Sequence, residues 1–358
     1  MGSSLEDWGW DARWAEAFAE DGARGLLAAR VVAQQRGLLT IATADAIRHA
    51  RVTGSMRHEA KGAADLPCVG DWIAAEANPG EEAMTVRRIL PRRTKLSRKA
   101  AGETLEEQVI ASNLDAVVVM TAMNADFNAR RLERFLAVVR ESGAEPVIAL
   151  NKADSCAEPG PYLGEARLVA GDAAVVAMSA KTGDGLAVLS QWIQPGRTVG
   201  FVGTSGVGKS TLINRLLGRE ALKTFETRAG DERGRHTTTH RELFVLPGGG
   251  VLLDTPGMRE MAFWEAGRGM AESFDEIDAL AAGCRFKDCA HGSEPGCAVK
   301  AAIESGALPA ARLESMNKLK KEMAFQKRRV DPATQAAEKK KWRSANKALR
   351  KRVKEKKK

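Results

Sequence analysis

The chain has 358 residues, 44% of them hydrophobic, and a formal net charge of +9. This length is typical of two or three domains with ample hydrophobic core. No apolar run reaches about 18 residues, the minimum for a membrane-spanning helix. The acidic start also lacks the charged leader and apolar stretch of a secretion signal. The composition therefore argues against membrane and secreted proteins and predicts a cytoplasmic one.

The first 95 residues are predicted to form a helical extension followed by a small barrel. Over residues 1–34, Trp8, Trp10 and Trp14 have the spacing of a short amphipathic helix that packs on the body. From residue 35 to 95 the pattern changes to short alternating runs broken by glycine and charge, which is typical of an OB-fold barrel. The expected strands are 38–42, 47–52, 71–75 and 85–90.

OB-fold surfaces bind RNA through basic grooves and stacked bases. Trp72 is the only aromatic residue between positions 35 and 95, and it can be either a core residue or a stacking platform. Because aromatic residues are so scarce here, we expect this barrel to contact RNA through backbone and shape more than through base stacking.

Strand and helix patterns alternate over residues 113–265, after a linker over 96–112. The linker follows basic residues around Arg92 and Arg93, and its part from 103 to 112 is predicted to be helical. Alternation of this kind predicts a mostly parallel α/β sheet with helices on both faces. In such sheets the ligand binds beyond the carboxyl ends of the strands.

Two short motifs in this region indicate recognition of guanine. The motif N-K-A-D at 151–154 ends the apolar strand 146–150, and S-A-K at 179–181 follows the strand 174–178. A carboxylate at Asp154 can accept both the ring N–H and the exocyclic amine of guanine, which adenine does not offer, so GTP is favoured over ATP. The residues expected at the base are Asn151, Lys152, Asp154, Ser179, Ala180 and Lys181.

Residues 203–210 fit the phosphate-loop pattern G-x-x-x-x-G-K-[ST] at every fixed position. An apolar strand, 198–202, precedes the loop, and helical spacing follows over 210–217. Glycines allow the backbone N–H groups to surround the phosphates, and the helix N-terminus adds favourable partial charge. Lys209 is expected to reach the β- and γ-phosphates, and the Ser210 hydroxyl to bind Mg²⁺. The loop residues expected at the nucleotide are Gly203, Thr204, Ser205, Gly206, Val207, Gly208, Lys209, Ser210 and Thr211.

A third element, D-T-P-G at 254–257, follows the apolar strand 250–253. Asp254 is expected to hold Mg²⁺ through water, and the Gly257 N–H to sense the γ-phosphate. The polar loop between the phosphate loop and this element contains G-R-H-T-T-T-H at 234–240. Thr238 in that loop is expected to complete the magnesium shell together with Ser210; the alternative is a threonine-rich loop without a role.

Many GTPases carry a glutamine after the last glycine of this element to orient the attacking water, whereas this chain has Met258. His236 is the nearest polar candidate for that task, unless it is an ordinary surface histidine. The hypothesis is slow intrinsic hydrolysis that accelerates when a partner orders the loop. The residues predicted to act in catalysis are His236, Lys209 and Thr238.

The order of these motifs differs from that of the usual GTPase chain, in which the phosphate loop comes first. Here the guanine motifs at 151–154 and 179–181 precede the phosphate loop at 203–210. The base-reading half has been moved ahead of the phosphate-reading half, as in a circular permutation.

A metal motif follows the GTPase region, in a segment over 266–335 that is predicted to be a helical domain. Cys284, Cys289, His291 and Cys297 form C-x₄-C-x-H-x₅-C, and three thiolates with one imidazole give the tetrahedral shell that structural Zn²⁺ prefers. Disulfides are a poor alternative, because nothing suggests secretion and three cysteines cannot all pair.

The positive charge is concentrated at the end of the chain. Residues 318–358 contain 18 Lys or Arg and 4 Asp or Glu, a net of +14, so the part before them sums to −5. Residues 336–358 are predicted to be a basic tail that binds a polyanion in a salt-dependent manner. The alternatives are a solvated helix end and an anionic membrane surface, the latter without an apolar face to insert.

With these motifs the chain resembles the bacterial ribosome-small-subunit-dependent GTPase family (RsgA, also called YjeQ), over about residues 37–326. The resemblance rests on the permuted order, the G-R-H-T-T-T loop and the zinc knuckle. It implies an OB-fold, a permuted GTPase domain and a zinc-binding helical domain. It also implies binding to the small ribosomal subunit and its rRNA in late subunit maturation, with GTP hydrolysis stimulated by the subunit and driving release.

Two other functions remain open at this point: a switch that binds GTP without turnover, which Met258 favours, and a GTPase with a different RNA or protein client. The cofactors expected are GTP or GDP, Mg²⁺ and one structural Zn²⁺. No heptad or exposed apolar stripe argues for an oligomer, so a monomer is expected.

Overall fold

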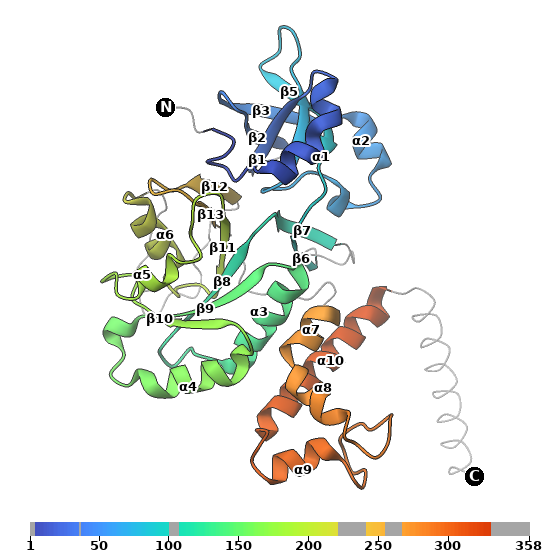
Figure 1. The fold of residues 1–358 in the computed structure, drawn as a ribbon, viewed down its shortest axis with the longest axis vertical. Helices are drawn as coiled ribbons and strands as arrows, with labels where there is room; N and C mark the ends of the chain where they lie inside the picture. The colour runs from blue at the N-terminus through green and yellow to red at the C-terminus, as the bar shows by residue number, and fades with distance from the viewer. Residues whose placement is uncertain (1–3, 36, 100–106, 221–240, 255–266, 331–358) are drawn as a thin grey trace, which may run out of the picture.

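The computed structural model describes residues 4–35, 37–99, 107–220, 241–254 and 267–330. Within these residues the chain forms three units: a β-barrel, a central α/β unit and a C-terminal helical unit (Figure 1). None of the described helices is long and apolar enough to cross a lipid bilayer.

The first unit is a closed barrel of five strands. They follow one another around the barrel in the order β1-β2-β3-β5-β4, and β4 pairs with β1 to close it. Strand β3 is connected to β4 through helix α2 (Gly54–Glu59) and a short 3₁₀ turn. The strands are β1 (Leu27–Gln35), β2 (Leu38–Ala42), β3 (Ile47–Val52), β4 (Trp72–Glu76) and β5 (Ala83–Ile89).

Strand β1 corrects the prediction of a helical extension over 1–34. Helix α1 (Ala12–Ala23) is present, and Asp11 caps it by accepting hydrogen bonds from two backbone N–H groups. The chain then turns into β1, whose Ala- and Gln-containing sequence has weak strand preference. It is nevertheless a strand because β2 and β4 pair with it on both sides. Tertiary pairing overrides local propensity here.

Trp72 belongs to the barrel core, which decides between the two alternatives left by the sequence. Its side chain is fully buried, and the ring of Trp10 lies 4.8 Å from it in an edge-on arrangement. Trp14 and Trp8 are buried as well, and the ring of Trp14 also lies against Trp72. Only Trp14 belongs to α1, however; Trp8 and Trp10 precede the helix, which corrects the prediction that all three lie on it.

The linker forms a β-hairpin of β6 (Lys95–Lys99) and β7 (Glu107–Ser112). This corrects the helix predicted over 103–112, of which residues 103–106 lie outside the described residues. Val109 and Ile110 are buried, and β-branched residues with a buried face favour a strand when a partner strand is available.

The central unit is a six-stranded sheet in the order β10-β9-β8-β11-β13-β12, parallel except for β12. Helices α3 (Ala129–Ser142) and α4 (Pro159–Ala170) cover one face, and α5 (Leu186–Leu189) and α6 (Lys209–Leu217) cover the other. The strands are β8 (Ala116–Ala122), β9 (Glu145–Asn151), β10 (Ala174–Ala177), β11 (Thr198–Gly203), β12 (Arg241–Val245) and β13 (Val251–Asp254).

The barrel and the central sheet are joined by direct strand pairing. Strand β12 pairs antiparallel with β1, with Ala33 opposite Glu242 and Gln34 opposite Arg241. The two units therefore share one sheet of eleven strands in the described part of the chain.

The third unit consists of α7 (Gly267–Ser273), α8 (Asp275–Ala281), α9 (Ala298–Glu304) and α10 (Ala310–Val330). It packs on α3 of the central unit (Figure 1). Helix α7 crosses α3 so closely that a Cβ on Gly269 would lie 2.0 Å from the carbonyl oxygen of Ala137, so only glycine fits. Arg312 on α10 adds an ion pair with Glu133 on α3.

Candidate nucleotide and metal sites

The predicted nucleotide residues meet at one edge of the central sheet. Strand β9 ends at Asn151, β11 at Gly203 and β13 at Asp254, and the S-A-K motif follows β10. These strands are parallel, so their carboxyl ends share that edge. Strand β11 with the phosphate loop lies at the centre, between β8 from one half of the sequence and β13 from the other.

The phosphate loop adopts backbone conformations that require glycine. Gly203 has φ 147°, and a Cβ there would lie 2.3 Å from the carbonyl oxygen of Met120. Gly208 has φ 100° and is the N-cap residue of helix α6. Gly206 also has a positive φ. The loop thus turns tightly from β11 onto the N-terminus of α6, the arrangement that binds phosphates.

Lys209 lies across this loop. Its Nζ donates hydrogen bonds to the carbonyl oxygens of Gly203, at 2.7 Å, and Thr204, at 2.9 Å. Ser210 is half-buried beside it in the first turn of α6, and Thr211 is exposed. An ammonium and a hydroxyl are therefore held at the mouth of the loop.

Asn151 connects the three loops of the site. Its Nδ2 donates to the carbonyl oxygen of Val207 at 2.7 Å, and its Oδ1 accepts from the Ala180 N–H at 2.8 Å. The side chain is only 3% exposed, and a Cβ on Gly208 would lie 2.3 Å from its amide nitrogen. Asn151 thus ties the phosphate loop to the S-A-K loop, and its position explains why the phosphate loop needs glycine at its last turn.

The guanine motifs contact each other directly. The Ser179 hydroxyl donates to Asp154 Oδ1 at 2.6 Å, and the Ala153 N–H donates to the carbonyl oxygen of Met178. Ser179 and Ala180 are buried, whereas Asp154 and Lys181 are exposed and Lys152 is half-buried. The buried Ser179 hydroxyl therefore holds one carboxylate oxygen of Asp154, while the residue itself stays exposed to solvent.

Asp254 is a buried acidic group at the end of β13. It is 7% exposed, and burial raises the pKa of its carboxyl to about 6; Lys209 opposes the shift and Glu242 adds to it. A carboxylate and the Ser210 hydroxyl are hard oxygen donors, which suit Mg²⁺ held with water and phosphate oxygens. The predictions for His236, Thr238, Gly257 and Met258 lie outside the described residues.

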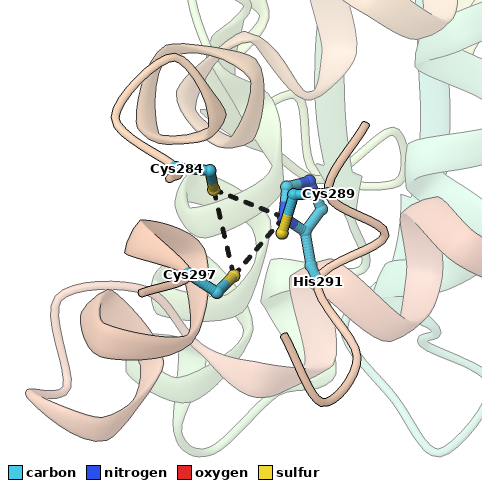
Figure 2. Close-up of side chains that lie close together, drawn as sticks. All are labelled: Cys284, Cys289, His291 and Cys297. Carbon is cyan, nitrogen blue, oxygen red and sulfur yellow. Dashed lines mark hydrogen bonds between the residues drawn. The ribbon is translucent and has the colours of Figure 1, made fainter. Parts of the chain in front are cut away.

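A second cluster lies in the helical unit, where Cys284, Cys289, His291 and Cys297 converge from one loop and the start of α9 (Figure 2). Their ligating atoms all lie within 4.8 Å of one another. Cys284 Sγ is 3.9 Å from Cys297 Sγ and 3.7 Å from His291 Nδ1. A tetrahedral shell with metal–ligand bonds of about 2.0–2.3 Å has donor separations of roughly 3.5–3.8 Å, so the four residues fit a Zn²⁺ ion.

The loop around this cluster is shaped for it. His291 has φ 59° and Gly296 has φ 76°, and these left-handed conformations turn the chain back toward Cys284. Glu294 accepts hydrogen bonds from two backbone N–H groups of the loop, and Cys297 Sγ accepts one from the Lys300 N–H at the start of α9. Cys68 is buried and Cys156 half-buried, and neither belongs to the cluster.

Comparison with known proteins identifies the family. Residues 89–264 match the family described as RsgA GTPase. A protein of Opitutus terrae named small ribosomal subunit biogenesis GTPase RsgA is 44% identical over 348 residues, which cover 95% of each chain.

The chain belongs to the RsgA GTPase family.

Other RsgA relatives and solved structures agree with this assignment. An RsgA protein of Methanosarcina acetivorans is 42% identical over 94% of this chain and 89% of its own. The crystal structure of YjeQ from Thermotoga maritima has the same fold, with a TM-score of 0.61 and 24% identity over 84% of this chain and 99% of its own. The structure of YloQ, described as a circularly permuted GTPase, has a TM-score of 0.60 and 25% identity over 84% and 96%.

Membership in the RsgA family makes this chain a GTPase, and the family implies GTP or GDP and Mg²⁺. The donor set at the sheet edge fits both. The resemblance inferred from the motifs and the three-part fold class are thereby confirmed.

Sequence reasoning misses two residues at this candidate site. Arg215 on α6 donates to the carbonyl oxygen of Lys181 at 2.9 Å and so holds the S-A-K loop against the helix. Glu242 on β12 lies opposite Asp254 across the strand pair. Neither residue belongs to a motif, and only the folded arrangement brings them to the site.

Proposed function

We propose that this RsgA GTPase binds the small ribosomal subunit and its rRNA late in the maturation of the subunit. Docking on the subunit stimulates GTP hydrolysis, and hydrolysis releases the protein from the mature particle. It acts as a monomer in the cytoplasm. The names of its relatives support the small ribosomal subunit as the partner, because the two relatives from Opitutus terrae and Methanosarcina acetivorans are each called a small ribosomal subunit biogenesis GTPase.

The observation that carries the GTPase part is the way Asn151 joins the loops. Its amide holds the phosphate loop on one side and the S-A-K loop on the other. Asn151 therefore fixes the position of a base bound at Asp154 relative to a phosphate bound at Lys209. In this arrangement Asp154 selects guanine and the Ala180 N–H binds the guanine carbonyl, with Lys152 over the base and Ser179 supporting Asp154.

At the phosphates, Lys209 exchanges the two carbonyl oxygens that it now contacts for β- and γ-phosphate oxygens. Ser210 and Thr238 would hold Mg²⁺, with Asp254 holding it through water, and the ion would neutralise charge on the phosphates. The N–H of Gly257 senses the γ-phosphate. Met258 cannot orient the attacking water, and His236, the nearest polar candidate, takes that task.

The remaining units supply contacts with the particle. We propose that Cys284, Cys289, His291 and Cys297 hold one structural Zn²⁺, which leaves no open position for catalysis. The barrel and the basic residues at the end of the chain bind rRNA, the latter through its phosphates and therefore in a salt-dependent manner.

The decisive experiment measures GTP hydrolysis by the purified protein alone, with small ribosomal subunits, and with large subunits as control. Strong stimulation by small subunits alone supports the reaction and the partner together. A slow rate that neither subunit changes would refute stimulation by the subunit and favour a passive switch or another client. A His236→Ala variant that keeps full stimulated turnover would remove His236 from the mechanism.

A further inference from the structure

Glu242 lies beside the phosphate-binding edge in a strongly constrained position. It is the second residue of β12, and its register partners are Asp254 on β13 and Ala33 on β1. Strands on both sides therefore fix the backbone that carries it. The mechanism proposed above gives this residue no task.

The side chain of Glu242 points to the same side of the sheet as that of Asp254. Directly opposed residues of an antiparallel pair share a face. The next pair on that face, Phe244 and Leu252, packs in the apolar cluster beneath helix α6, whereas Leu243 packs on the opposite face. Glu242 therefore faces the side of the sheet from which Lys209 and Ser210 project, and it is half-buried there.

Two carboxylates consequently face each other on neighbouring strands at the edge where the phosphates bind. Directly opposed side chains have Cβ atoms about 4.5–5.5 Å apart, and like charges at that separation repel. The charge of Glu242 acts on Asp254 against that of Lys209. A divalent cation at the edge would relieve this repulsion, whereas a nucleotide arriving without a metal would add to it.

We propose that Glu242 is a positioning residue of the magnesium site: its carboxylate adds a second negative charge beside Asp254, strengthens Mg²⁺ binding and weakens the binding of nucleotide without metal. This inference rests on the proposed binding of nucleotide and Mg²⁺ at this edge. Glu242 acts through the electrostatic field and through metal-bound water, while Ser210 and Asp254 remain the closer donors. The device makes nucleotide binding depend more steeply on Mg²⁺ than Asp254 alone would.

The test uses the full chain with a fluorescent GDP analogue, first titrated in the presence of a metal chelator and then against Mg²⁺ at fixed nucleotide. Glu242→Gln removes the charge and keeps the shape. Glu242→Asp keeps the charge on a shorter side chain. Glu165→Gln on α4 is the matched control, since it removes one exposed carboxylate from the same unit on a helix away from the site.

We expect Glu242→Gln to need about 3- to 10-fold more Mg²⁺ for half-maximal effect and to bind metal-free GDP about 2- to 3-fold more tightly. Glu242→Asp should stay close to the wild type, and Glu165→Gln should change neither value. The opposite signs of the two effects distinguish an electrostatic role from local damage, which would weaken both.

An unchanged Mg²⁺ requirement in Glu242→Gln would overturn the inference, as would a joint loss of metal-free and metal-dependent binding. The inference would also be overturned if Glu242→Asp raised the Mg²⁺ requirement as much as Glu242→Gln does. If the wild-type protein bound no guanine nucleotide, the proposed function itself would fail, and this inference with it.

Discussion

Asn151 shows how one side chain can organise a binding site without contacting the phosphates. Both ends of its amide are used, one on the phosphate loop and one on the S-A-K loop, and the group is almost fully buried. A buried hydrogen bond that loses its partner leaves a polar group unsatisfied, at a cost of about 1–3 kcal/mol. The loops would then be free to separate.

Asn151→Ala is therefore expected to weaken the binding of GDP and of GTP to a similar extent, by roughly 10- to 100-fold. Calorimetric or fluorescence titration with both nucleotides measures the effect. Asn78→Ala is the control, because Asn78 makes hydrogen bonds of the same kind within the barrel, far from the site. Equal affinities in Asn151→Ala and the wild type would show that the loops hold their places by other means.

At the scale of single elements, the loop of the Cys₃His cluster, residues 284–297, illustrates a segment whose fold would depend on a bound metal. Residues 284–297 contain no described helix or strand, and the loop's turns at His291 and Gly296 lie in the left-handed region. So small a segment has little core of its own, and a bound metal supplies folding free energy to it. Helix α9 begins at the fourth ligand and should depend on the metal as well.

Removal of zinc is accordingly expected to unfold the knuckle and α9 while leaving the nucleotide site intact. A strong chelator should release one Zn²⁺ per chain, measured by metal analysis, and should expose the segment around residue 290 to protease. GDP binding should persist. Cys289→Ser should mimic the chelator, whereas Cys156→Ser should not; a chain that binds no zinc when purified from zinc-supplemented cells would contradict the assignment.

The limits of prediction from sequence also appear at this scale. The phosphate-loop, guanine and Cys₃His motifs can be predicted from the sequence because their chemistry needs particular residues at short spacing. Strand β1 was missed because its Ala- and Gln-containing sequence becomes a strand only through β2 and β4. Strand β7 was mistaken for a helix for a similar reason. The pairing of Glu242 with Asp254 depends on the register between two strands, which no motif records.

At the scale of the whole molecule, the helical unit is attached to the GTPase sheet through α3. Arg312 on α10 forms an ion pair with Glu133 on α3 and another with Glu276 on α8, and both Arg312 and Glu133 are less than 10% exposed. The guanidinium also donates to the carbonyl oxygen of Ser273 and lies over the Phe274 ring. A buried ion pair that loses one partner leaves an uncompensated charge, which costs about 3–5 kcal/mol.

Arg312→Met is thus expected to lower the stability of the contact between α3 and the helical unit by about 3 kcal/mol or more. Thermal unfolding should show the loss, and proteolysis should release the C-terminal helices before the GTPase core. The double variant Arg312→Met with Glu133→Gln should recover part of the stability, because it removes the orphaned charge. No recovery in the double variant would mean that packing, and not charge, holds this contact.

The position of β12 has a consequence for the order in which the protein can be completed during its synthesis. The barrel and strands β8, β9 and β10 emerge first, and domains generally fold as they emerge. Strand β11 then adds to the exposed side of β8, yet the sheet still lacks β12 and β13. Strand β12 is synthesised next and can pair with the barrel strand β1, and β13 follows it and fills the last gap, between β11 and β12. Insertion of β13 therefore joins the sheet to the barrel through β12 and brings Asp254 opposite Glu242, so the edge that carries these two carboxylates is finished only when the barrel is joined to the sheet.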